Sequence, residues 1–197
     1  MGRSSRPIHP DELAELLDVA ASAFERCGYA AASLSDVLAE ADIPKKSFSE
    51  SIGEKKDLFE RVLADRLRAL QEQVILPDPA LLDDTTFWPT IRRVVENVDS
   101  AARRDPRTVQ AGRLAHLSDA PRVPALEEMQ STLRGWLHAI LERGRELDCV
   151  DAHLPVELQR SLTIAVMVEV DQWVQREEAN QGDPELADEL LRRLLSA

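Results

Sequence analysis

Two lysine pairs stand close together near the beginning of this 197-residue chain, in the stretch IPKKSFSESIGEKKDLF that covers residues 43–59. The pairs are Lys45–Lys46 and Lys55–Lys56, and three serines lie between them. Ammonium and hydroxyl groups are side-chain donors that bind phosphate oxygens, so this stretch favours contact with a phosphate-bearing partner. The alternative is that the lysines form only a solvated edge of a helical bundle.

The charge of the whole chain makes this lysine cluster stand out. The net charge is −12, from 24 Lys and Arg against 36 Asp and Glu. Residues 43–56 hold four Lys and two Glu, a balance of +2, whereas residues 1–57 together hold seven basic and eleven acidic side chains, a balance of −4. A chain this acidic is not suited to bind nucleic acid over its whole surface, but a local basic patch can still bind phosphates.

Other kinds of chemistry have little support in the sequence. The two cysteines, Cys27 and Cys149, have neither a CxxC pair nor a His-rich pattern beside them, so we expect no metal and no cofactor. Cys27 continues an apolar helical stripe and is expected to be buried, whereas the carboxylates beside Cys149 should disfavour its thiolate. No Ser-His-Asp order, no paired carboxylates with a cleft signature and no metal-ligand set stands out, so we do not expect an enzyme.

Composition and patterning favour an all-α protein. Hydrophobic residues make up 44% of the chain, which is enough for a packed core, and strand-like alternation is hard to find. The N-terminus has no apolar region of the secretory type, and the longest apolar run, residues 164–168, is far too short to cross a bilayer. We therefore expect a cytoplasmic protein with no membrane partner.

Apolar residues at helical spacing, together with start and stop signals such as Pro10 and Gly28, predict about nine helices. The predicted ranges are 10–28, 33–42, 44–53, 54–76, 85–104, 106–117, 125–147, 155–180 and a last helix that begins at 183–185. They divide the chain into a three-helix head, a linking fourth helix and a helical C-terminal body. By function, we expect a first domain over residues 1–56 and a second over residues 57–197.

The head has the plan of a helix-turn-helix, because two short helices, 34–41 and 45–52, are joined by a tight turn and braced by a longer one. In that motif the second helix of the pair enters the major groove of DNA and the first crosses the backbone. Any three-helix bundle can show this spacing. The lysine pairs at both ends of the helix over 45–52 add support for the DNA-binding interpretation.

Residues 15–59 resemble the N-terminal domain of the TetR (tetracycline-repressor-like) family of bacterial regulators. The matching residues occur in the order and spacing of that family; they are Phe24, Gly28–Tyr29, Ser33–Leu34, Asp36–Val37, Ala41, Asp42–Ile43, Lys45, Ser47–Phe48, Ile52–Gly53, Lys55 and Leu58. The resemblance implies that the head binds DNA. The residues expected to contact DNA are Ser33, Lys45, Lys46, Ser47, Ser49 and Lys55.

The chain departs from the family pattern at several head positions. Ala32 stands where a Thr or similar hydroxyl is usual, and Lys46 stands where a small residue is usual. The third helix presents Ser49, Glu50 and Ser51 in the region where the family usually has a Tyr and often a His or second Tyr. A serine can still donate to a phosphate, whereas Glu50 repels phosphate unless it accepts from a cytosine amino group.

The resemblance also implies a small-molecule pocket among the middle helices and a homodimer formed by the last two helices. Candidate pocket residues are Trp88, His116, Met129 and Trp136. Candidate dimer residues are Leu162, Ala165, Val166, Trp173 and Leu190. The helix over 155–180 is apolar around much of its circumference, which favours a further partner, and a symmetric dimer implies a palindromic operator.

The function that follows is a ligand-responsive repressor that binds double-stranded DNA at a palindromic operator as a dimer and is released by a small-molecule effector. The alternative is an interaction protein that keeps the scaffold but binds DNA weakly or not at all. Ala32, Ser49, Glu50 and Ser51 motivate that alternative.

Overall fold

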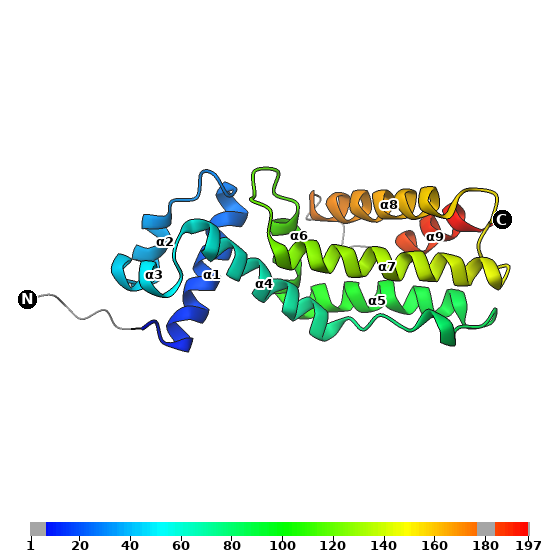
Figure 1. Ribbon diagram of the computed structural model, residues 1–197, viewed down its shortest axis with the longest axis horizontal. Helices are drawn as coiled ribbons and strands as arrows, with labels where there is room; N and C mark the ends of the chain where they lie inside the picture. The colour runs from blue at the N-terminus through cyan, green and yellow to red at the C-terminus, as the bar shows by residue number, and fades with distance from the viewer. Residues whose placement is uncertain (1–6, 177–183, 197) are drawn as a thin grey trace, which may run out of the picture. The chain divides into compact units, whose positions relative to one another are not determined.

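The computed structural model describes residues 7–176 and 184–196, and every regular element in these two ranges is helical (Figure 1). The predicted all-α class is therefore confirmed. The α-helices are α1 (Pro10–Cys27), α2 (Leu34–Glu40), α3 (Lys45–Ser51), α4 (Lys55–Gln73), α5 (Phe87–Arg104), α6 (Pro106–Ala115), α7 (Pro124–Glu146), α8 (Val156–Arg176) and α9 (Pro184–Leu195), with a short 3-10 turn, η1 (Pro79–Leu81), before α5.

The first two helices begin and end close to the predicted residues. α1 begins with a capping box in which the His9 side chain accepts from a backbone N–H and Glu12 accepts from the His9 N–H at 2.8 Å. It ends at Gly28, whose φ of 79° lies in the left-handed region that glycine adopts without strain. Ser33 caps α2 by accepting from the Asp36 N–H at 3.3 Å.

Two of the later boundaries differ from the predictions for local reasons. α4 ends at Gln73 rather than at Leu76, because Pro77 disfavours helical backbone just before it and Ile75, which is 80% exposed, has no core to pack on. α5 begins at Phe87 rather than at residue 85, and neither of the threonines before it, Thr85 and Thr86, caps it with its side chain. Instead the Asp83 carboxylate accepts from the N–H groups of both threonines, at 3.1 and 2.8 Å. Hydrogen bonds to this carboxylate lower the Asp83 pKa to about 2, and the largest cause is the bond from the Thr85 hydroxyl.

By packing, the chain forms two compact units. The first consists of residues up to Ala69 together with Arg107–Glu127, and the second of Leu70–Pro106 together with Glu128–Ala197. Most of α4, nearly all of α6 and the loop after α6 therefore belong with the head. The expected boundary between residues 56 and 57 divides the chain by function, and it stays a prediction.

Helices α1 to α4 bury a shared core in the first unit. Its largest side chains are Phe24, Phe48, Phe59, Leu16 and Leu63, each at most 1% exposed. The Phe24 and Phe59 rings meet edge to face at 5.1 Å, and the Tyr29 ring lies 5.2 Å from Phe59. The prediction that Cys27 is buried is wrong: it is the last residue of α1 and is exposed, and these rings close the core at that end instead.

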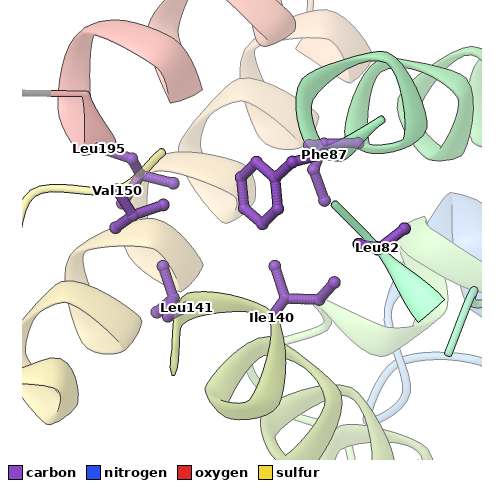
Figure 2. Packing of buried hydrophobic residues seen from close by; sticks show 7 residues of the cluster. Leu82, Phe87, Ile140, Leu141, Val150 and Leu195 are labelled. Carbon is purple, nitrogen blue, oxygen red and sulfur yellow. The ribbon is translucent and has the colours of Figure 1, made fainter. Parts of the chain in front are cut away.

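The second unit is organised around one apolar cluster, in which α9 packs against α5 and α8. Figure 2 shows the Phe87 ring in the middle of this cluster, with Ile140, Leu141 and Val150 around it. Leu82, Ile91 and Leu195 complete the cluster. Leu195 ties the end of α9 to the α7–α8 connection, since its carbonyl oxygen accepts from the Asp151 N–H at 2.8 Å.

Two glycines on α7 give a matched test of this packing. A Cβ on Gly144 would lie 2.5 Å from Val150 Cγ2 and 2.6 Å from Phe87 Cζ, whereas a Cβ on Gly135 would meet nothing within 4 Å. We expect Gly144→Ala to lower the free energy of unfolding by about 1–3 kcal/mol, because both neighbours are rigid and buried. Gly135→Ala should raise it by about 0.5–1 kcal/mol, because alanine restricts the unfolded chain.

Urea unfolding followed by tryptophan fluorescence measures both changes. Trp88 and Trp136 pack against the same cluster, so their emission reports on the second unit. Equal effects of the two alanines, in sign and size, would show that α7 does not approach Phe87 and Val150 this closely.

Candidate nucleic-acid interface

The α2–turn–α3 segment has the close connection that a helix-turn-helix requires. α2 ends at Glu40, and Asp42 takes a positive φ of 52°, which Asp tolerates better than most residues. The Ile43 N–H then donates to the Leu38 carbonyl at 2.9 Å, and α3 begins at Lys45. The predicted pair of short helices is therefore present, and its second member carries the first lysine pair.

One side of α3 packs into the core of the first unit and the rest is exposed. Phe48 is 1% and Ser47 7% exposed, so Ser47 has little side-chain surface to offer to DNA. The exposed residues form what is called below the outer face of α3: Lys45, Lys46, Ser49, Glu50 and Ser51. It contains three of the six residues expected to contact DNA, and these contacts stay predictions.

Both ends of this segment are held by side chains outside α3. Ser33, another expected contact, is exposed and its hydroxyl oxygen caps α2. At the other end of α3, Arg61 on α4 donates to the Ser51 carbonyl at 3.3 Å. A basic side chain near a helix C-terminus interacts favourably with the partial negative charge there. Arg61 therefore fixes the end of α3 on α4, which the sequence patterns did not indicate.

Lys55 has a different position from the one expected of a phosphate contact. Its Nζ donates to the Ala30 carbonyl at 3.1 Å and lies 4.8 Å from the centre of the Tyr29 ring. Its side chain thus holds the turn between α1 and α2, while the side chain of its neighbour Lys56 is exposed. A contact of Lys55 with DNA stays a prediction, and Lys56 is the more accessible member of the second pair.

Asp119, which follows α6, also binds the turn between α1 and α2. Its two carboxylate oxygens accept from the Tyr29 N–H at 3.2 Å and from the Ala30 N–H at 2.7 Å. Hydrogen bonding by Ala30 is the largest cause that lowers the Asp119 pKa, with the Tyr29 N–H and the charge of Lys55 acting in the same direction. The loop after α6 is therefore fastened to the backbone of the head.

This carboxylate predicts a defined dependence on pH. A lowered folded-state pKa means that the Asp119 contacts stabilise the fold fully above the unfolded pKa of about 3.9 and lose that effect as pH falls through the folded value. We expect the Ala30 amide resonance to titrate with a midpoint below 3.9 and to lose this titration in Asp119→Asn. NMR titration measures it; a midpoint at or above the ordinary Asp value would contradict the contact.

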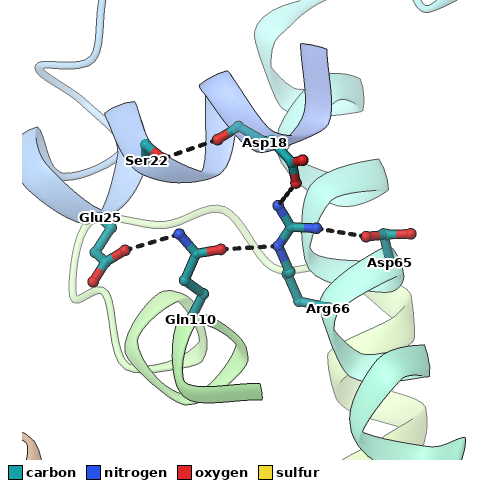
Figure 3. A network of polar contacts seen from close by, with 6 residues as sticks. All are labelled: Asp18, Ser22, Glu25, Asp65, Arg66 and Gln110. Carbon is teal, nitrogen blue, oxygen red and sulfur yellow. Dashed lines mark hydrogen bonds and ion pairs between the residues drawn. The ribbon is translucent and has the colours of Figure 1, made fainter. Parts of the chain in front are cut away.

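Arg66 is the most deeply buried charged residue of the first unit. It is 2% exposed and lies on α4, where its guanidinium reaches Asp18 of α1 at 2.5 Å and its neighbour Asp65 at 2.7 Å. Its Nε also donates to the Gln110 side chain of α6 at 3.1 Å. Figure 3 shows the guanidinium between these three partners, so one side chain joins three helices.

A second set of contacts extends this network along α6. The Gln110 side-chain amide donates to Glu25 of α1 at 3.1 Å, and Arg113 forms an ion pair with the same carboxylate (Figure 3 includes Gln110 and Glu25). Arg113 and Glu25 are 39% and 23% exposed. Partners this far apart in sequence give no local signal, which is why Arg66, Gln110 and Asp119 were not predicted from the sequence.

The expected pocket residues are divided between the two units. Trp88 and Trp136 both pack against the apolar cluster of the second unit, and Trp136 Nε1 donates to the Pro77 carbonyl at 2.8 Å. Met129 is half-buried on α7, whereas His116 is exposed and belongs to the first unit. A pocket lined by Trp88, His116, Met129 and Trp136 stays a prediction.

α8 has an inverted pattern of burial in its first half. Its polar Gln159 and Thr163 are 1% and 2% exposed, while Leu158 and Leu162 are 45% and 37% exposed. The buried Gln159 is satisfied, because its oxygen accepts from Arg145 Nε at 3.0 Å and its amide donates to the Asp151 carbonyl at 2.6 Å. Leu158, Leu162 and Ala165 share one side, called below the outer face of α8.

The other expected dimer residues are less informative. Val166 on α8 and Leu190 on α9 are half-buried, and the side chain of Trp173 lies outside the described residues. The dimer interface as a whole stays a prediction.

The described residues also bear on metal binding, on the Cys149 thiol and on membrane-spanning helices. Within residues 7–176 and 184–196, no group of three or more His, Cys, Asp or Glu is placed to hold a metal ion. Burial first, and then Asp84 and Asp148, raises the Cys149 pKa, which agrees with the expected suppression of its thiolate. None of the helices in that part of the chain is long and apolar enough to cross a membrane.

Comparisons with known proteins rest on structure. No family model matches the sequence, and no curated protein matches it. A TetR family transcriptional regulator from Chloroflexus aurantiacus superposes with a TM-score of 0.71 at 17% identity, covering 96% of this chain and 95% of its own. A TetR family regulator from Agrobacterium tumefaciens gives 0.65 at 16% identity, covering 95% of this chain and 98% of its own.

A third structure has a ligand. The transcriptional regulator FadR from Bacillus subtilis, in complex with stearoyl-CoA, gives a TM-score of 0.66 at 15% identity, with 93% of this chain and 97% of its own chain covered. At such identities the likeness concerns the fold. The protein therefore has the fold of the TetR-family transcription regulators, as the head motif predicted.

Proposed function

We propose that the protein is a transcription regulator that binds double-stranded DNA at a palindromic operator as a homodimer and responds to a small-molecule effector. The observation that carries this proposal is the outer face of α3, where Lys45 and Lys46 are exposed on the second helix of a helix-turn-helix. The net charge of the chain is −12, so this local positive charge is the part suited to a polyanion.

The proposed contacts divide by their surroundings. Lys45, Lys46 and Ser49 lie on the outer face of α3 and contact DNA directly, and Ser33, at the start of α2, donates to the DNA backbone. Lys55 is already bonded to Ala30, so its first role is to hold the turn that supports the helix pair.

A dimer formed through the outer face of α8 is supported by the inverted burial of that helix. Exposed leucines beside buried polar residues leave apolar surface that a second copy would cover. A two-fold axis uses the same surface twice and sets two α3 helices against two half-sites of a palindrome.

Leu162→Glu tests the dimer. The charge would be buried without a partner at the interface, so we expect dimer dissociation to become about 10-fold or more easier, together with weaker operator binding. Sedimentation velocity over a concentration series measures the first effect. The matched control is Val98→Glu on α5, which replaces another exposed apolar side chain, 43% exposed, and should leave the dimer intact. A dimer unaffected by either change would place the interface elsewhere.

The effector is proposed to bind in the second unit, beside the apolar cluster against which Trp88 and Trp136 pack. An effector releases DNA only if it binds the DNA-competent and DNA-incompetent geometries with different affinity. Because FadR from Bacillus subtilis carries stearoyl-CoA on the same fold, stearoyl-CoA is the first probe to use.

The second candidate function is an interaction protein that keeps this scaffold. Glu50 favours it, because a carboxylate on the outer face of α3 lies where phosphate would be repelled. The two candidate functions differ in whether the protein prefers one DNA sequence over another.

Fluorescence anisotropy with the DNA upstream of the protein's own gene, and with random duplex of equal length, tests the proposal. We expect a preference for the upstream DNA at every salt concentration, an affinity that falls as salt rises, and release on addition of an effector. Equal affinity for both duplexes at all salt concentrations would favour the interaction protein.

A further inference from the structure

Glu50 is an acid that local stability does not explain. It lies near the C-terminal end of the seven-residue α3, where the helix dipole disfavours a carboxylate. Its side chain is 51% exposed, and its ion-pair partner among the described residues is Lys46, at 3.8 Å and 66% exposed. An exposed pair of this kind contributes little to stability. A residue that goes against both the helix dipole and the expected phosphates points to a role in recognition.

The chemistry of the two side chains limits what they can recognise. A carboxylate only accepts hydrogen bonds, and a lysine only donates them. In the major groove, Glu takes the cytosine N4 amino group, and Lys takes the O6 and N7 acceptors of guanine. A G·C pair offers two adjacent acceptors and then a donor. In an A·T pair the donor lies between two separated acceptors, which suits the lysine less well.

The geometry of the pair fits one such base pair. Lys46 and Glu50 are one helical turn apart on the outer face of α3, and the two ends, Nζ and Oε1, lie 3.8 Å apart. Guanine O6 and cytosine N4 are hydrogen-bonded to each other within their base pair, so they lie about 3 Å apart. The spacing of the two side-chain ends is therefore close to the spacing of the two groups on the base edges.

We propose that Lys46 and Glu50 act together as a base-reading pair that specifies one G·C pair in each half of the operator. This inference rests on the DNA binding proposed above and names what that binding recognises. Lys46 takes the guanine edge and Glu50 the cytosine amino group. Glu50 then serves specificity rather than affinity, because it discriminates against bases that present no donor at its position.

Selection of duplexes from a random pool tests the proposal. The protein is compared with Glu50→Ala and Glu50→Gln, and with Glu54→Gln as the matched control, since Glu54 is also an exposed acid beside the lysine cluster. For the unchanged protein we expect one G·C position per half-site, preferred on the order of 10-fold. Glu50→Ala should flatten that position alone, and Glu50→Gln should shift it toward adenine, which Gln prefers. Glu54→Gln should leave the motif unchanged.

The outcomes separate the inference from the function on which it rests. A motif that stays the same in both Glu50 variants, with affinity raised equally for all sequences, means that Glu50 only repels phosphate and overturns the pair. Loss of discrimination at an A·T position also overturns the G·C assignment. If the unchanged protein enriches no sequence, the proposed function fails, and the base-reading pair fails with it. All three variants alter exposed side chains, and thermal melting verifies that each is folded.

Discussion

Arg66→Ala should lower the free energy of unfolding of the first unit by about 2–4 kcal/mol. Its guanidinium is 2% exposed and joins α1, α4 and α6 through Asp18, Asp65 and Gln110. Removing it leaves a cavity and three partners without their donor. The expected loss of unfolding free energy is smaller than for a fully buried ion pair, because Asp18 is 67% exposed and can be hydrated again.

Arg68→Ala is the matched control for this prediction. Arg68 lies on the same helix, two residues further along, and its side chain is exposed, so its loss should change stability by no more than about 0.5 kcal/mol. Urea unfolding followed by far-ultraviolet circular dichroism measures both variants. Arg66→Met keeps most of the side-chain volume and separates lost packing from lost hydrogen bonds. Indistinguishable effects of Arg66→Ala and Arg68→Ala would contradict the joining role of Arg66.

The double replacement of Lys45 and Lys46 by alanine should weaken DNA binding about 10- to 100-fold near 0.1 M salt. Each lysine that meets a phosphate releases about one counterion, so the slope of log affinity against log salt should fall by about 1 to 2. The lower limit applies if Lys46 contacts a base rather than a phosphate. Stability should change little, because both side chains are exposed.

Arg134→Ala provides the control for charge alone. Arg134 is exposed on α7 in the second unit, so removing it changes the net charge without touching α3. Anisotropy titrations at several salt concentrations give the affinity and the slope for each variant. An unchanged slope in the double lysine variant would mean that other residues hold the phosphates.

The helices of the head could be predicted closely because local chemistry sets their ends. Pro10 and Gly28 limit α1, and Ser33 caps α2 through a bond to a residue three positions away. Such contacts lie within one helical turn, and the sequence shows them directly. The exposure of Lys45, Lys46 and Ser49 likewise follows from the periodicity of α3 about the buried Phe48.

The contacts that hold the head to later parts of the chain could not be predicted in this way. Arg66 meets Gln110 across 44 residues, and Asp119 meets Tyr29 across 90. Neither pair has a spacing or composition that distinguishes it from surface charge. The prediction that Cys27 is buried is wrong for a related reason. Cys27 continues the apolar stripe of α1, but whether a helix end is covered depends on the elements around it. Ser47 is a similar case, because it is buried beside Phe48 although it directly follows the exposed Lys46.

Amide hydrogen exchange with and without the upstream duplex tests the central claim most directly, since it reports where DNA lies on the protein. If the head binds DNA, exchange should slow in α2, α3 and the start of α4, over residues 33–56, with no comparable change in the α5 and α7 segments of the second unit. Random duplex should give weaker protection at the same concentration. DNA binding that leaves α3 unprotected, or that protects the second unit instead, would contradict an interface on the head.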